Sequence, residues 1–277
     1  MRAARTRNLV LGIVAIVVTA VVFLVPFAFI LVTAFKTQQE SSLLELSWPT
    51  QFVFFDNLRE VLATRDNMII RAFVNSTIVT VASVGVMVVL AAMVGWVLQR
   101  RQQRWNGFIN FLVLAGLIIP PAVVPTIFVM QKLGIFRSIP GLVLIEIAFG
   151  LSFCVLLFRA FAATIPRELD EAALLDGAGP LRLFFQVAFP LLRSVIITVI
   201  VVQAVAVFND FANPLYFAPG AENVTVQLTL YNFQSQFYTS WNLLFTNILL
   251  ITIPPLIMYI FFNRQIVAGM TSGAIKG

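Results

Sequence analysis

The chain has 277 residues, of which 60% are hydrophobic and only 11% are charged. A soluble domain carries about 25% charged residues, so this composition excludes an ordinary soluble protein and indicates an integral membrane protein. Histidine is absent and Cys154 is the only cysteine. The sequence therefore excludes histidine-based acid–base chemistry, the usual zinc sites and a disulfide framework.

Six apolar segments predict six transmembrane helices, because each approaches or exceeds the roughly 20 residues needed to cross a bilayer. In chain order they are residues 9–35, 72–98, 108–130, 141–161, 191–211 and 243–262. Pro120, Pro121 and Pro125 predict a break or kink in the third span. A short helix lying on the membrane is expected at residues 56–63, within an outer segment at residues 36–70.

The basic residues set the expected orientation. Twelve of the 18 lysines and arginines fall in segments assigned to the cytoplasm and six in outer segments. This bias predicts that both termini are cytoplasmic, and it accounts for the net charge of +6 without a nucleic-acid partner. We expect three regions: an N-terminal part at residues 1–70, a transport domain at residues 71–263 and a cytoplasmic tail at residues 264–277.

An acidic segment, residues 168–180, lies on the cytoplasmic side within the loop at residues 164–190. Glu168, Asp170 and Glu171 crowd one turn, where a helix dipole favours negative charge. Gly177 then offers a left-handed stop, and Pro180 can open a second short helix. A polar helix–turn–helix of this kind cannot rest in lipid, so it is free to be a docking surface. The alternative is an ordinary amphipathic surface helix between two spans.

This segment resembles the EAA loop of the membrane subunits of ATP-binding-cassette (ABC) importers. The residues that carry the resemblance are Glu171, Ala172 and Ala173, then Asp176, Gly177 and Ala178, and finally Phe189 and Pro190. The resemblance implies a coupling helix that seats in a groove of an ATPase subunit. Its implied coupling residues are Glu171, Ala172, Ala173, Asp176 and Gly177. Glu171 is expected to make the docking contact, whereas Glu168 and Asp170 are expected to be solvated or helix-end charges.

The sequence does not contain a phosphate-binding loop. Such a loop ends in Gly-Lys-Ser/Thr, and none of the three lysines, Lys36, Lys132 and Lys276, has that setting. We therefore expect that this chain does not hydrolyse ATP and carries no cofactor. ATP and Mg²⁺ would be bound by the partner ATPase.

A second motif, Phe208-Asn209-Asp210-Phe211, resembles the Trp-Asn-Asp/Glu-Phe signature of sugar-importing ABC permeases, with Phe208 in place of tryptophan. On a continuous helix Gln203, Asp210 and Asn213 would share one face, which could line the pathway and bind sugar hydroxyls. The candidate pathway residues are Glu146, Gln203, Asn209, Asp210 and Asn213. The alternatives are a polar staple between helices or a helix-end contact, and Glu146 is not part of the family pattern.

The tail at residues 264–277 resembles the ending of the carbohydrate-uptake permeases, the maltose-type group, with Met270 in place of leucine. Gly269 and Gly273 predict an extended arm in place of a long helix. The resemblance implies that the tail reaches the ATPase pair. The implied contact residues are Thr271, Gly273, Lys276 and Gly277. The alternative is a frayed terminus.

Taken over the chain, the resemblance implies an all-α integral membrane protein with six transmembrane helices, the type I ABC importer fold and a cytoplasmic EAA coupling helix. It implies a non-catalytic permease subunit that works by alternating access in a bacterial or archaeal cytoplasmic membrane. Its partners would be a second permease, an ABC ATPase dimer and an extracytoplasmic sugar-binding protein. The alternatives are a permease for another solute, such as a polyamine or a glycerol phosphate ester, and a stand-alone ion-coupled carrier.

Overall fold

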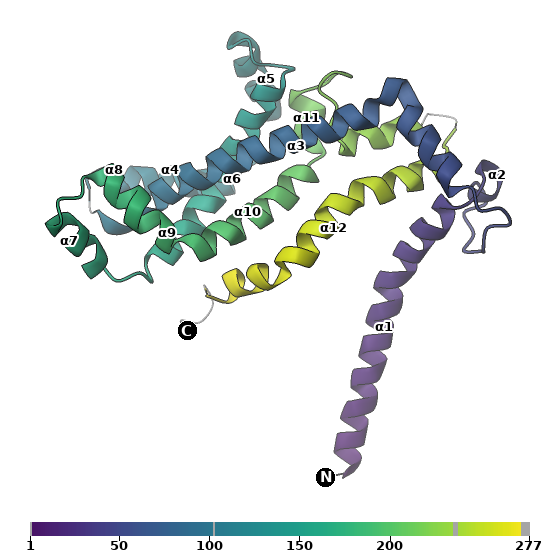
Figure 1. The fold of residues 1–277 in the computed structure, drawn as a ribbon, viewed down its shortest axis with the longest axis horizontal. Helices are drawn as coiled ribbons and strands as arrows, with labels where there is room; N and C mark the ends of the chain where they lie inside the picture. Colours follow the sequence, from purple (N-terminus) through teal and green to yellow (C-terminus); the bar gives the residue numbers. More distant parts are fainter. Residues whose placement is uncertain (1, 102, 235–237, 273–277) are drawn as a thin grey trace. The chain divides into compact units, whose positions relative to one another are not determined.

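The computed structural model describes the chain except residues 1, 102, 235–237 and 273–277, and for residues 2–10 and 263–272 it describes the backbone only. Within the described residues the structure is helical, apart from an isolated antiparallel bridge between Gln234 and Thr239. The helices are α1 (Arg2–Ala34), α2 (Gln38–Ser41), α3 (Phe54–Arg100), α4 (Asn106–Ile118), α5 (Val123–Lys132), α6 (Ile139–Ala162), α7 (Glu168–Leu175), α8 (Pro180–Leu183), the π-helix η1 (Phe184–Ala188), α9 (Phe189–Leu191), α10 (Arg193–Phe208), α11 (Ala212–Phe217), the 3₁₀ helix η2 (Gln227–Phe233) and α12 (Trp241–Ser272) (Figure 1).

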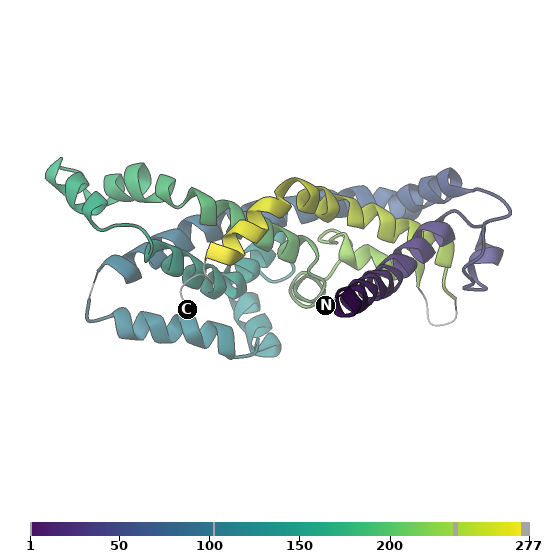
Figure 2. The same ribbon diagram turned by 90° about the horizontal axis from the view of Figure 1, so that it is seen from below.

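Within the described residues, length and composition give up to six spans when each bent helix pair is counted as one. Four helical stretches qualify directly: Leu11–Ala34, Phe54–Arg100, Ile139–Ala162 and Trp241–Phe262. The other two spans are bent pairs, α4 with α5 at 116° and α8–α9 with α10 at 76°. Figure 2 shows the first of these turns, which lies at the predicted Pro120–Pro121 break. The predicted all-α architecture with a broken third span is therefore confirmed.

Within α3 the backbone leaves the helical conformation over four residues. Thr64 is extended, and Arg65, Asp66 and Asn67 all have positive φ, at 49°, 57° and 55°. Left-handed backbone costs roughly 1–2 kcal/mol per residue that carries a Cβ. The break separates the expected short outer helix from the second span, so both predicted elements are present within α3.

The C-terminal tail differs from the expectation over its first nine residues. Helix α12 continues to Ser272, so residues 264–272 are helical and the predicted extended arm is wrong there. Extending an existing helix adds a hydrogen bond per residue without a new nucleus, whereas Gly269 costs only about 1 kcal/mol relative to alanine. Residues 273–277 lie outside the described part of the chain.

The helical contacts divide the chain into two compact units. The first comprises Met1–Ile70 and Thr229–Ile253, and the second comprises Arg71–Leu228 and Pro254–Gly277. The expected division into residues 1–70, 71–263 and 264–277 rests on membrane topology and stays a prediction. It does not assign residues 229–253 to the first unit, because that association depends on tertiary contacts.

The first unit is held together by buried polar contacts near its helix ends. The Asn57 side chain donates to the carbonyls of Ala34 at 2.9 Å and Lys36 at 3.0 Å, and it accepts from Asn242 Nδ2 at 2.8 Å. These bonds join the starts of α3 and α12 to the end of α1. The Lys36 ammonium is buried and donates to the Glu45 carbonyl at 2.7 Å, which ties down the connection between α2 and α3.

The second unit has an apolar core built from α3, α6, η1 and α10. Gly95 permits a close approach of α3 to α6, because an added Cβ would lie 2.8 Å from both the Arg159 backbone nitrogen and Phe158 Cβ. Gly150 does the same on α6, where a Cβ would lie 2.4 Å from Met87 Sδ. These approaches hold α3 and α6 side by side toward the end of the unit where α7 lies.

Candidate functional site

Helix α7, the centre of the acidic segment, lies at the far end of the second unit in both views (Figures 1 and 2). Glu168, Asp170 and Glu171 occupy its first turn, as the sequence predicts. The amide groups of Asp170 and Glu171 donate to the Arg167 carbonyl at 3.0 and 3.2 Å. The three carboxylates therefore stand near the positive end of the helix dipole, where negative charge is stabilised.

The end of α7 is a glycine-dependent turn. Gly177 has φ +79°, its amide donates to the Leu174 carbonyl at 3.0 Å, and the Ala178 amide donates to the Ala173 carbonyl at 2.9 Å. These two bonds form a Schellman motif, which satisfies the last carbonyls of the helix. The predicted left-handed stop at Gly177 is confirmed, and α8 then begins with Pro180.

The five predicted coupling residues have different exposures. Glu171, Ala172, Asp176 and Gly177 are exposed, whereas Ala173 is only 9% exposed and packs inside the loop. The small side chain of Ala173 thus serves the packing of α7 within this chain. The four exposed residues extend from the first turn of α7 to the turn that ends it.

Leucines add an apolar component that sequence reasoning missed. Leu175 is 90% exposed, Leu174 is 55% exposed and Leu181 is 64% exposed. Their signal in the sequence was the set of apolar residues interleaved with the acids, to which sequence reasoning assigned no role. Exposed apolar groups clustered beside charged groups on a polar loop are typical of a protein interaction surface.

Asp170 lies in the first turn of α7, as expected of a helix-end charge, but it is not solvated. Its Oδ2 lies 3.0 Å from Arg100 Nε at the end of α3, and the two side chains are only 15% and 9% exposed. Burial raises the pKa of Asp170 above its ordinary value, and the guanidinium groups of Arg100 and Arg167 act in the opposite direction. The contact was missed because Arg100 had been treated only as one of the basic residues that set orientation.

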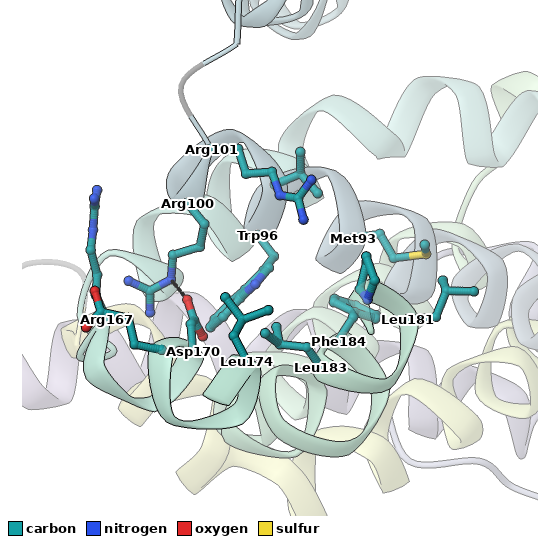
Figure 3. A pocket seen from close by; sticks show the side chains of 13 residues that line it. Met93, Trp96, Arg100, Arg101, Arg167, Asp170, Leu174, Leu181, Leu183 and Phe184 are labelled. Atoms are coloured by element: carbon teal, nitrogen blue, oxygen red, sulfur yellow. Dashed lines mark ion pairs between the residues drawn. The ribbon is translucent and has the colours of Figure 1, made fainter. Parts of the chain in front are cut away.

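A cavity of about 380 Å³ separates the end of α3 from the acidic loop. Figure 3 shows it from close by, with Met93 and Trp96 from α3 on one side and Leu174, Leu181 and Phe184 on the other. Its lining is mostly apolar, with the Arg100–Asp170 pair at one wall. The loop is thus attached to α3 through a charged contact beside a space that close packing does not fill.

The predicted pathway residues occupy the junctions around α11 and the interior of α6 and α10. Buried Glu146 accepts a hydrogen bond from Asn213 Nδ2 at 3.2 Å. Asp210 Oδ1 accepts from the amides of Ala212 at 2.8 Å and Asn213 at 3.3 Å. Glu146 and Asp210 are therefore brought together through Asn213, and Asp210 supports the first turn of α11 as a helix-end contact.

Gln203 and Asn209 lie apart from that group. Buried Gln203 donates to Cys154 Sγ at 3.1 Å, between α10 and α6. Asn209 donates to the Val205 carbonyl at 2.9 Å and accepts from Gln227 at 3.0 Å. Helix α10 ends at Phe208, so the single helix face predicted for Gln203, Asp210 and Asn213 does not exist.

The predicted tail contacts cannot be placed in the same way. Thr271 lies in α12 without a described side chain, and Gly273, Lys276 and Gly277 lie outside the described residues. Among the residues that the structure describes, no group of three or more histidine, cysteine, aspartate or glutamate side chains could hold a metal ion.

Comparison with known proteins identifies the family. The model of the "binding-protein-dependent transport system inner membrane component" family matches residues 87–272, which include the acidic loop. The chain belongs to this family. Its members are membrane components of transport systems, and the chain is accordingly a non-catalytic, multi-pass membrane transport subunit.

Individual relatives of this family cover almost the whole chain. The diacetylchitobiose uptake system permease protein NgcG of Streptomyces coelicolor is 30% identical over 94% of this chain and 87% of its own length. The melibiose/raffinose/stachyose import permease protein MelC of Bacillus subtilis is 27% identical over the full length of both chains. A solved bacterial ABC transporter that imports the acidic polysaccharide alginate has the same fold, with a TM-score of 0.82, 19% identity and coverage of 95% of this chain and 98% of that chain.

Proposed function

We propose that the chain is the permease subunit of an ATP-driven importer that takes up a sugar from an extracytoplasmic binding protein. The relatives of known name support this substrate class, since they import diacetylchitobiose or melibiose, raffinose and stachyose. A second solved structure with a similar fold, at a TM-score of 0.69 and 14% identity, is an alginate transporter in complex with an alginate-bound periplasmic protein. That complex supports the binding protein as a partner.

The observation that carries the proposed mechanism is the exposure of α7. Glu171 and Leu175 are both exposed on a short helix, whereas Ala173 and Asp170 pack within the chain. An acid beside an exposed leucine fits a groove that is apolar at its centre and basic at its rim. We assign this groove to an ATPase subunit, which would bind ATP and Mg²⁺ and move α7 as it closes.

The remaining partners and the topology follow from the same assignment. A second permease would complete the pathway through the membrane, and both termini and α7 would lie in the cytoplasm with the ATPase pair. Glu146, Gln203, Asn209, Asp210 and Asn213 stay candidates for the pathway, and Thr271, Gly273, Lys276 and Gly277 for a tail contact with the ATPase. Closure of the ATPase pair would drive alternating access to the sugar.

The direct test is affinity purification of the tagged chain from its native cells in mild detergent, with the co-purifying proteins identified by mass spectrometry. Glu171→Lys is compared with Glu168→Lys, which makes the same charge change on an exposed residue of the same helix. An ATPase should accompany the wild type and Glu168→Lys and be lost with Glu171→Lys. Wild type purified without any ATPase, or sugar uptake that persists after ATP depletion and follows the proton gradient, would contradict the proposal.

A further inference from the structure

We propose that Arg100 is a positioning residue that joins the coupling helix α7 to α3, so that movement of the docked loop is passed to that span. This inference rests on the proposed function, because it names the connection through which the docking surface acts on the bundle. It concerns Asp170, a largely buried residue of α7, and not the exposed residues proposed to touch the ATPase.

The Arg100 guanidinium makes contacts on three sides. Its Nε lies 3.0 Å from Asp170 Oδ2 on α7. Its second terminal nitrogen donates to the Ile165 carbonyl at 2.8 Å and approaches the Pro166 carbonyl at 3.4 Å, in the segment that leads into α7. Its carbon centre lies 4.5 Å from the centre of the Trp96 ring, one turn earlier on α3. The planar fork of an arginine suits this combination, whereas a lysine cannot reproduce it.

Burial makes this pair different from a surface ion pair. Exposed pairs contribute little because water and salt screen them, but Arg100 is 9% exposed and Asp170 is 15% exposed. Both stand at the wall of the largely apolar cavity in Figure 3. Removing one partner would leave the other charge largely buried without its ion-pair partner, which is more costly than losing a solvated pair.

The other end of the connection is rigid, which lets α3 carry a displacement. Trp96 is 5% exposed, and the close approach at Gly95 sets α3 directly against Phe158 of α6. Close-packed elements of this kind move together because they have no free space to deform into. A pull on Asp170 through Arg100 therefore reaches the α3–α6 pair.

The connection from α7 to α10 along the chain differs from the ion pair that joins α7 to α3. After α8 the chain passes through the π-helix η1 and α9, and α10 then departs at 76°. A π-helical turn and a sharp bend can absorb a rotation that a straight helix would transmit. The ion pair to α3 is thus the more direct mechanical link between α7 and the spans.

The test uses the complete transporter reconstituted in liposomes, with ATP hydrolysis and sugar uptake measured on the same preparation. Arg100→Gln is compared with Arg101→Gln, and Asp170→Asn with Glu168→Gln; the controls remove the same charge from exposed neighbours. We expect Arg100→Gln and Asp170→Asn to retain the ATPase but to hydrolyse about 10-fold more ATP per sugar, within the usual range of coupling between sites. Asp170→Glu should restore much of the coupling, and Arg100→Lys should restore only part of it.

Four outcomes would overturn the inference. One is a wild-type ratio of ATP to sugar in Arg100→Gln. Another is loss of the ATPase from Arg100→Gln but not from Arg101→Gln, because the residue would then act on docking. The third is equal uncoupling in the exposed controls. The fourth applies if Arg100→Gln does not insert into the membrane: a well-folded Arg100→Lys variant that couples ATP hydrolysis to uptake as well as the wild type does. Failure of the proposed function is separate, since the wild-type chain would then bind no ATPase at all.

Discussion

The acidic loop at residues 168–180 and the polar group around Glu146 both place carboxylates in an otherwise apolar chain. Apart from Asp170, the loop leaves its carboxylates exposed, whereas the carboxylates around α11 are hydrogen-bonded within the chain. In the loop, Glu171 and Asp176 are left exposed beside a leucine that is 90% exposed. Around α11, Glu146 is 6% exposed and bonded to Asn213, while Asp210 accepts backbone amides. Carboxylates that are hydrogen-bonded within the chain stabilise its structure. Exposed carboxylates beside exposed leucines remain available to bind a partner protein. The comparison therefore assigns the partner surface to the loop.

The largest effect is expected from Leu175→Asp. If Leu175 enters an apolar groove, a buried carboxylate without a partner would weaken docking by about 2–5 kcal/mol, and sugar uptake should fall by roughly 100-fold. The isolated chain should melt and elute like wild type, because Leu175 is 90% exposed. Normal uptake by Leu175→Asp would show that this surface is only solvated.

Gly177→Ala should disrupt the loop less severely. The left-handed conformation at φ +79° costs a residue with a Cβ about 1 kcal/mol, although an added Cβ would meet no atom within 4 Å. Hydrogen exchange of the α7 amides should therefore be about 5-fold faster. Gly179→Ala is the matched control, because Gly179 has φ −68° and equally open surroundings. Equal exchange in the two variants would contradict a cap that depends on Gly177.

Variants of Asp210 test whether the polar group around α11 has a structural role. Asp210→Ala removes the acceptor for the Ala212 and Asn213 amides and should destabilise the start of α11 by about 1 kcal/mol. Asp210→Asn keeps a side-chain oxygen at that position and should transport at close to the wild-type rate. Loss of uptake by Asp210→Asn in a protein of normal stability would make the charge itself functional.

The smallest effect is expected from the pH dependence of Asp170. Its pKa in the folded chain is raised by burial above the ordinary value of about 3.9, so between these two values the folded state binds more protons than the unfolded state. Stability should therefore fall as the pH rises through this window. Asp170→Asn should flatten that slope in melting curves recorded from about pH 3.5 upward. A slope that Asp170→Asn leaves unchanged would assign the titration to another group.

Much of the fold could be predicted from the sequence, because long apolar runs, proline breaks and the glycine stop are local signals. The break at Pro120 and the left-handed Gly177 are examples. The misses depend on contacts between distant segments: Arg100 with Asp170, and the burial of Ala173. The end of α10 at Phe208 was missed because Asn209 and Asp210 were interpreted as polar residues within the fifth span, whereas Asp210 accepts the amide of Ala212 at the start of α11.

The docking of α7 on an ATPase is tested most directly by site-specific photo-crosslinking in membranes that contain the whole transporter. A photoreactive amino acid is placed at residue 175 on α7 or at residue 216 on α11, where the native Leu175 and Tyr216 are both exposed. An adduct with the ATPase from residue 175 and none from residue 216 is the predicted result. An ATPase adduct from residue 216 alone would contradict both the docking surface and the orientation of the chain.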